Sequence, residues 1–205
     1  MRSGVRPVAA VAGLSTVAGV GLIGAAVVAT RRLWFGGYVS EAGIAAEPNA
    51  ALYQAGMVSV AVGLVLAALA VAPMVPAAGW LLVLSGAFAG VSGAVPCSAG
   101  CPLPPYEATT MADLVHAVAS VLAVGASTLA MGAVAHGCEA DDRWRRLSRI
   151  AFWATGALVA LAAAAMLGLG RGYATGLLER VILVGSCAWV FYTCAHLAAR
   201  PSDHG

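Results

Sequence analysis

The chain has 205 residues, of which 61% are hydrophobic and only 10% are charged, and its mean hydropathy is +0.89. Soluble domains carry about 25% charged residues, so this composition excludes an ordinary soluble domain. The net charge of +2 includes eleven arginines and no lysine, and these arginines form no dense patch of the kind that nucleic-acid binding needs. We therefore expect a membrane protein without a nucleic-acid partner.

Apolar residues gather into six runs, each about long enough to cross roughly 30 Å of hydrocarbon as a helix. The short alternating segments of a membrane β-barrel are absent from the sequence. The pattern predicts an all-α fold, a polytopic membrane helical bundle of six transmembrane helices in a single domain, 1–205. The predicted helices are 8–30, 50–72, 77–95, 112–135, 150–170 and 175–198.

The stretch 96–116, PCSAGCPLPPYEATTMADLVH, is the least hydrophobic long interval between two strongly apolar runs. It contains the close pair Cys97 and Cys101 and leads into the fourth predicted helix. Thr109 or Thr110 is predicted to cap that helix, because a hydroxyl oxygen can accept a hydrogen bond from an unpaired backbone N–H.

The cysteine pair has three interpretations. A structural disulfide suits a loop in an oxidising compartment, and Gly100 between the two cysteines eases a tight closure. A redox-active pair more typically has the spacing C-x-x-C. A metal site needs more ligands than His116, which alone lies nearby in sequence. The pattern favours a structural Cys97–Cys101 disulfide.

Arginine counting predicts the orientation, because cytoplasmic loops are enriched in positive charge. A cytoplasmic N-terminus places seven arginines inside and four outside. We therefore predict a multi-pass protein of the cell membrane with both termini in the cytoplasm and with Cys97 and Cys101 on the oxidising side. The inside set is Arg2, Arg6, Arg143, Arg145, Arg146, Arg149 and Arg200, and the outside set is Arg31, Arg32, Arg171 and Arg180.

In this topology the outer face collects most of the ionisable groups. Charged groups near membrane depth are costly and usually face a bundle interior or a polar cavity. We expect Glu41, Asp113, His116 and Glu179 to converge on an outward-opening pocket, where they are candidate catalytic residues. The alternative is that they are solvated charges at helix ends. For Asp113 this alternative has further support, because the helix dipole stabilises an acid in the first turn of a helix.

Histidine placement argues against bound metals and cofactors. His116 is predicted to be outside and His136, His196 and His204 inside, so three histidines cannot gather around one zinc ion. A haem held by His136 and His196 is geometrically allowed, but interfacial anchoring explains both residues equally well. We expect no metal and no cofactor.

Several motifs together resemble the domain of unknown function 998 family, small six-helix membrane proteins. They are Ser40-Glu41-x-Gly43 before a Pro48-Asn49 turn, Cys97-x-x-x-Cys101-Pro102 followed by His116, and Gly176-Leu177-Leu178-Glu179-Arg180 before a helix with Trp189. The sequence departs from the family at Tyr53-Gln54, where relatives often have Phe-Asn. The resemblance implies a fold over nearly the whole chain and no established reaction.

These observations lead to one functional expectation and two alternatives. We expect binding of a lipid or another apolar small molecule in an outward-facing pocket, with membrane lipids as partners. The first alternative is a membrane-embedded enzyme, a hydrolase, transferase or cyclase, that uses carboxylate and histidine acid–base chemistry on a lipid or isoprenoid. The second is a small transporter, although no predicted helix is charged or broken at its middle. Candidate substrate-binding residues are Arg180, Tyr53 and Trp189.

Overall fold

The computed structural model describes residues 4–30, 37–102, 107–137, 141–170 and 172–200. These residues form six long helices and one short 3-10 helix, η2. Each long helix is apolar and long enough to cross a membrane, which confirms the all-α, six-span fold. The elements are α1 (Val5–Ala29), η2 (Val39–Gly43), α2 (Ala50–Val71), α3 (Pro76–Ala94), α4 (Met111–His136), α5 (Asp142–Leu169) and α6 (Tyr173–Ala199).

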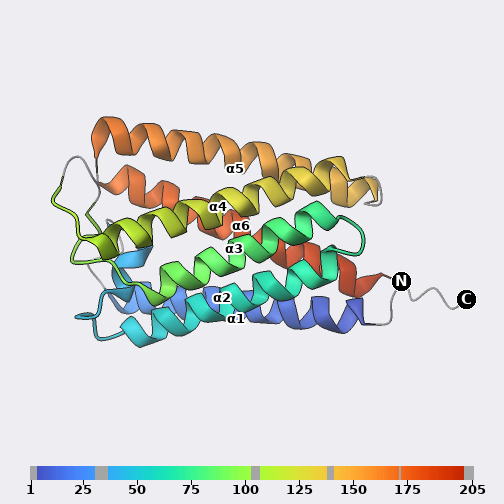
Figure 1. The fold of residues 1–205 in the computed structure, drawn as a ribbon, viewed down its shortest axis with the longest axis horizontal. Coiled ribbons are helices and arrows are strands. Elements are labelled where there is room, and N and C mark those ends of the chain that lie inside the picture. The colour runs from blue at the N-terminus through green and yellow to red at the C-terminus, as the bar shows by residue number, and fades with distance from the viewer. Residues whose placement is uncertain (1–3, 31–36, 103–106, 138–140, 171, 201–205) are drawn as a thin grey trace, which may run out of the picture.

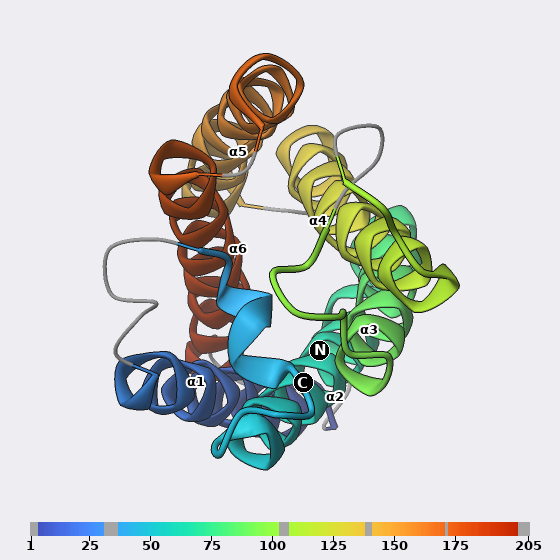
Figure 2. The same ribbon diagram turned by 90° about the vertical axis from the view of Figure 1, so that its left-hand side faces the viewer.

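The six long helices form a closed ring. Each helix packs against the next in the chain, and α6 returns to pack against α1 (Figure 2). The start of α1 and the end of α6 lie at one end of the bundle, which we call the terminal end (Figure 1). The opposite end carries η2 and the loop with Cys97 and Cys101, and we call it the disulfide end. Arg2, Arg31, Arg32 and Arg171 lie outside the described residues, and the cytoplasmic location of the terminal end stays a prediction.

Glycines allow α1, α2 and α3 to pack closely. A methyl group added at Gly19 of α1 would lie 2.7 Å from the carbonyl oxygen of Gly56 on α2. A methyl at Gly86 of α3 would lie 2.9 Å from the carbonyl oxygen of Ala61 on α2. In a membrane the hydrophobic effect does not drive helices together, so small residues that allow close packing stabilise helix association. The small residues of α5 behave differently, since Gly156 and Gly168 face open space.

The terminal half of the ring contains the large, fully buried side chains of the hydrophobic core. Its largest fully buried apolar side chains come from every helix except α1: Val71, Leu82, Met131, Val134, Trp144, Val190 and Leu197. At the disulfide end, by contrast, the buried residues include Glu41, Asp113 and His116. The ring therefore has an apolar half and a half whose interior contains ionisable groups.

Helix α5 begins at Asp142, eight residues before the predicted start at residue 150. The added turns contain Arg143, Arg145, Arg146 and Arg149, so a hydropathy pattern cannot detect them. Asp141 caps these turns by accepting a hydrogen bond from the backbone N–H of Trp144 at 2.9 Å. The helix thus continues beyond the apolar segment because a local cap, rather than the membrane, sets its start.

Candidate functional site

Helix η2 lies inside the ring at the disulfide end, in contact with α1, α2 and α6 (Figure 2). All five of its residues are buried. Irregular backbone at this depth is stable only if its polar groups are satisfied by protein. Two carboxylates provide hydrogen-bond acceptors for this backbone. Glu41 Oε1 accepts from the backbone N–H of Tyr38 at 2.9 Å, and Glu179 Oε2 accepts from the backbone N–H of Val39 at 2.8 Å.

The first turns of α6 hold the chain just before η2. Arg180 Nη1 donates to the carbonyl oxygen of Gly37 at 3.1 Å. Gly176 lies against the same carbonyl group, so closely that a Cβ would have no room. Residues 176, 179 and 180 share one helix face because they are three and four apart. This face of α6 is therefore a binding surface for the backbone of residues 37–39.

Tyr53 lies beneath η2, near the start of α2. Its side chain is 5% exposed and packs with Val39, Ala42 and Ala26. Gly43 lies directly against the tyrosine ring, and a side chain there would collide with it. Tyr53 and Glu179 therefore contact η2 from two different helices, α2 and α6.

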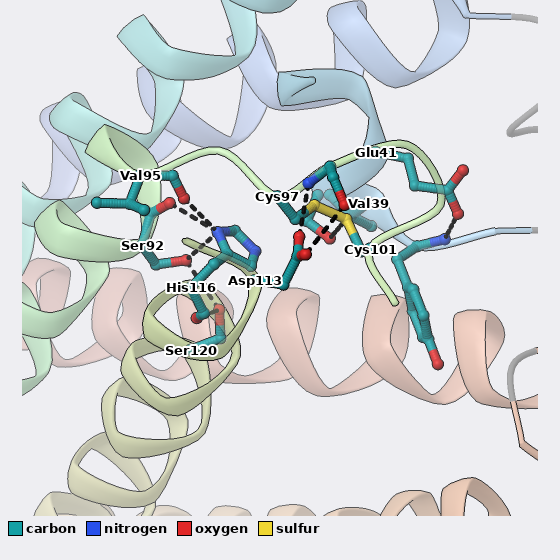
Figure 3. The surroundings of a disulfide bond; sticks show 12 residues. Val39, Glu41, Ser92, Val95, Cys97, Cys101, Asp113, His116 and Ser120 are labelled. Carbon is teal, nitrogen blue, oxygen red and sulfur yellow. Dashed lines mark hydrogen bonds between the residues drawn. A yellow bond between two sulfur atoms is a disulfide. The ribbon is translucent and has the colours of Figure 1, made fainter. Parts of the chain in front are cut away.

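The cysteine loop lies beside η2. The sulfur atoms of Cys97 and Cys101 are at disulfide-bonding distance, with their Cα atoms 5.0 Å apart (Figure 3). Gly100, at φ 85°, and Cys101, at φ 47°, both adopt left-handed backbone conformations that turn the loop tightly. Ser40 Oγ lies 3.3 Å from Cys101 Sγ, which joins the cysteine loop to η2.

Asp113 joins the cysteine loop to the start of α4. Its side chain is only 2% exposed, and it accepts four hydrogen bonds. Oδ1 accepts from the backbone N–H of Ser98 at 2.6 Å, and Oδ2 accepts from the Ser98 hydroxyl and from both the backbone N–H and the hydroxyl of Thr110. Thr110 in turn accepts from Asp113 N, which confirms one of the two predicted caps.

His116 joins α4 to the end of α3. Its Nδ1 lies 2.9 Å from the carbonyl oxygens of Ser92 and of Val95 (Figure 3). Carbonyl oxygens only accept, so this geometry assigns the ring hydrogen to Nδ1. In the neutral ring the other nitrogen, Nε2, is then the basic atom.

The structure arranges the predicted site residues in two adjacent groups. Glu41, Glu179, Arg180 and Tyr53 surround η2, whereas Asp113 and His116 surround the cysteine loop, and the Ser40–Cys101 contact links the groups. Trp189 belongs to neither group. It is ten residues beyond Glu179 on α6, which is about 15 Å along a helix. Its indole N–H donates to Ser148 Oγ of α5 at 2.9 Å.

Metal ligands are not grouped in the part of the chain that the structure describes, where no three His, Cys, Asp or Glu side chains are placed to hold one ion. The buried carboxylates instead bind backbone N–H groups and hydroxyls. Carboxylate and imidazole groups of this kind can form hydrogen bonds and transfer protons.

An apolar groove runs between α3 and α4 at the disulfide end. It has a volume of about 360 Å³ and begins at Met111, the first residue of α4. It lies on the same turns of α4 as Asp113 and His116 but on a more exposed side, where Met111 and Val118 are 75% and 56% exposed. Its lining residues are all apolar: Phe88, Val91, Met111, Leu114, Val115, Val118 and Ala119.

Comparison with known proteins places this arrangement in a family. A family model described as "Protein of unknown function (DUF998)" matches residues 10–196, which include all of α2 to α5 and all but the outermost residues of α1 and α6. The chain belongs to the DUF998 family. No curated protein and no solved structure matches it. The resemblance noted from the sequence motifs is thereby confirmed, and family membership brings no reaction with it.

Sequence reasoning missed several polar residues of this DUF998 protein. Ser92 and Ser98 bind His116 and Asp113, but isolated serines in apolar or loop sequence carry no distinctive pattern. At the terminal end, Asp141 Oδ2 lies 2.6 Å from both His196 Nε2 and Arg200 Nη2. A local signal for this second cluster is Asp141 itself, because aspartate is a preferred residue at the N-cap of a helix.

Proposed function

We propose that this DUF998 protein binds a lipid, or an apolar small molecule of similar shape, at its disulfide end. The observation that carries the proposal is the wholly apolar groove between α3 and α4, directly beside a polar, hydrogen-bonded cap. Its volume of about 360 Å³ falls within the range of small-molecule pockets, roughly 300–1,000 Å³. An apolar chain fits the groove, and a polar head fits the loop above it.

Helix α4 supplies both parts of this site. Asp113 and His116 fix its first two turns to the cysteine loop and to α3, through hydrogen bonds of 2.6 to 2.9 Å. Met111, Val115 and Val118 on the same turns line the groove. In this proposal the buried polar residues give the groove a fixed shape, and the shape selects one ligand from the surrounding lipid. Rigid sites bind more tightly because less conformational freedom is lost.

The test is a comparison of two tryptophan substitutions on α4. Val118→Trp fills the groove, whereas Val121→Trp adds the same side chain at a position that is 70% exposed and lies outside it. Each variant is purified in detergent, and its bound lipids are extracted and identified by mass spectrometry. We expect one lipid species to be enriched on the wild type and on V121W and to fall by about tenfold or more on V118W.

Thermal unfolding of the same samples separates ligand loss from misfolding. Adding the enriched species back should raise the unfolding temperature of the wild type and of V121W, because a ligand that binds only the folded state stabilises it. The proposal is wrong if V118W keeps the same lipid complement and the same stabilisation as the wild type.

A second candidate is an enzyme that acts on the bound lipid. It is favoured by the position of Glu179 and His116, which bring a carboxylate and an imidazole with a basic Nε2 to the same end of the ring. The extracts described above distinguish the two functions. An enzyme changes the lipid, so the wild type and E179Q should carry chemically different species, whereas a binding protein carries the same species in both.

A further inference from the structure

The first turns of α5 present a cationic face at the terminal end, which is the opposite end from the proposed lipid groove. Arg143, Arg146 and Arg149 are all exposed. Successive members are three residues apart, so their side chains project from neighbouring turns on one side of the helix. We call these three residues the arginine face.

The arginine face points away from the bundle. The buried residues of α5 are Trp144, Ser148 and Thr155, which lie on the opposite side of the helix. Trp144 and Ser148 contact α6 through hydrogen bonds with Thr193 and Trp189. The packing of α5 against α6 therefore fixes which side of the helix meets the surroundings.

Apolar side chains continue the same face toward the membrane. Ile150 is 59% exposed and Trp153 is 68% exposed. The indole ring of Trp153 packs edge-on against Phe152, with ring centroids 5.0 Å apart. Tryptophan is enriched where the hydrocarbon of a membrane meets the headgroups. The residues therefore change from cationic to apolar and aromatic along one side of α5, as a lipid changes from its headgroup to its chains.

Asp141 and Asp142, which lie near the arginine face, are both already paired. Asp142 is exposed on the same side and pairs with Arg145. Asp141 pairs with His196 and Arg200 of α6. Within the described part of the chain, Arg143, Arg146 and Arg149 have no ion pair. Cations in the first turns of a helix also lie at the positive end of its dipole, so an external anion relieves an unfavourable interaction.

We propose that the arginine face binds the phosphate of an anionic phospholipid, with Trp153 at the boundary between its headgroup and its chains. Two guanidinium groups on neighbouring turns can approach one phosphate, and a guanidinium group binds phosphate with paired hydrogen bonds. Arginine clusters beside a membrane helix are attracted to anionic lipid surfaces. The inference does not depend on the proposed groove, which lies at the other end of α4.

The experiment measures how strongly the purified protein prefers phosphatidylglycerol to phosphatidylcholine. Detergent-solubilised protein is mixed with the two lipids, and native mass spectrometry counts the lipid molecules of each kind that stay bound. We expect the wild type to prefer phosphatidylglycerol. In R143Q/R146Q/R149Q this preference should fall by at least about tenfold, because each arginine near an anionic surface contributes separately. High salt should weaken the preference of the wild type and leave that of the triple variant unchanged.

Matched single variants separate a site from general charge. R146Q and R6Q each remove one positive charge from an exposed arginine at the terminal end, and only R146Q alters the arginine face. R146Q should reduce the preference and R6Q should not. Equal losses in R146Q and R6Q, or an unchanged preference in the triple variant, would overturn the proposal. Displacement of the lipid by inorganic phosphate, but not by sodium chloride at the same ionic strength, would also overturn it, since the site would then bind a small anion.

Discussion

Asp113 is a carboxylate in an almost fully buried position, and its four hydrogen bonds offset the cost of burying it. Asp113→Asn keeps the shape but replaces one accepting oxygen with a donating NH2 group. The backbone N–H groups of Ser98 and Thr110 can then no longer both find acceptors. A buried unsatisfied donor costs about 1–3 kcal/mol, so we expect D113N to be destabilised by about 2 kcal/mol. The measurement is thermal unfolding of purified protein in detergent.

Asp142→Asn is the matched control for D113N. The Asp142 side chain is 93% exposed and pairs with Arg145 on the surface of α5. Exposed ion pairs contribute little, so D142N should change stability by no more than about 0.5 kcal/mol. If the two variants unfold at the same temperature, the hydrogen bonds of Asp113 do not stabilise the start of α4.

Local residues of the candidate site were predictable from sequence, and distant ones were not. Thr110 and Asp113 form a cap through residues three apart, a pattern that short sequence windows contain. The hydrogen bond from Val39 to Glu179 joins residues separated by 140 positions. No local pattern specifies that contact, because η2 is ordered by α2 and α6 rather than by its own sequence.

Contact between α1 and α2 offers a test at the level of helices. Gly19→Ala would place a methyl group 2.7 Å from the carbonyl oxygen of Gly56 and 2.8 Å from the backbone nitrogen of Val60. Backbone atoms cannot move aside as a flexible side chain can, so the two helices must separate. We expect G19A to lose about 1–3 kcal/mol of stability, the usual cost of overpacking. Thermal unfolding in detergent measures the loss.

Gly21 provides the comparison on the same helix. A methyl group added there meets no atom within 4 Å. Alanine also favours a helix more than glycine does, so G21A should be neutral or slightly stabilising. Similar destabilisation by G19A and G21A would mean that close approach of α1 and α2 does not depend on Gly19.

Helices as elements were the most predictable part of the fold. The thickness of a membrane requires long apolar runs, and five of the six helices end within about three residues of the predicted limits. The exception is the start of α5, where charged turns extend beyond the apolar run. Small residues alone do not locate the contacts between helices. Gly63 of α2 and Gly86 of α3 lie against neighbouring helices, but Gly156 and Gly168 of α5 face open space.

At the terminal end of the ring, one polar cluster joins three parts of the chain. Asp141 caps α5 through Trp144 and pairs with His196 and Arg200 of α6. Arg200 also contacts Met74, in the turn between α2 and α3, and lies over the Trp144 ring at 5.6 Å. Three separate parts of the chain therefore meet at Asp141 and Arg200. Helix α5 packs against two helices, α4 and α6. We therefore expect this cluster to contribute strongly to holding α5 in the ring.

Acid should weaken this cluster before it affects the apolar core. Partial burial acts to raise the pKa of Asp141, but hydrogen bonds from Trp144, Arg200 and His196 outweigh it and hold the pKa below its usual range. A carboxyl whose pKa is lower in the folded state than in the unfolded state stabilises the fold. This contribution is complete above the unfolded-state pKa, about 3.9. It is lost as the pH falls from that value through the folded-state pKa. The stabilisation by Asp141 should therefore be complete at neutral pH and decline below about pH 4.

Hydrogen exchange of the first turns of α5, compared between the wild type and D141N, measures this contribution. At neutral pH, residues 142–149 should exchange faster in D141N, because the neutral amide could still cap α5 but could not form an ion pair with Arg200. The difference between the two proteins should shrink as the pH is lowered below about 4, because Asp141 then takes up a proton in the unfolded state before it does so in the folded one. D142N, which removes an exposed carboxylate, should exchange at the same rate as the wild type at every pH. A difference between wild type and D141N that stays constant with pH would show that the charge of Asp141 does not hold α5 in the ring.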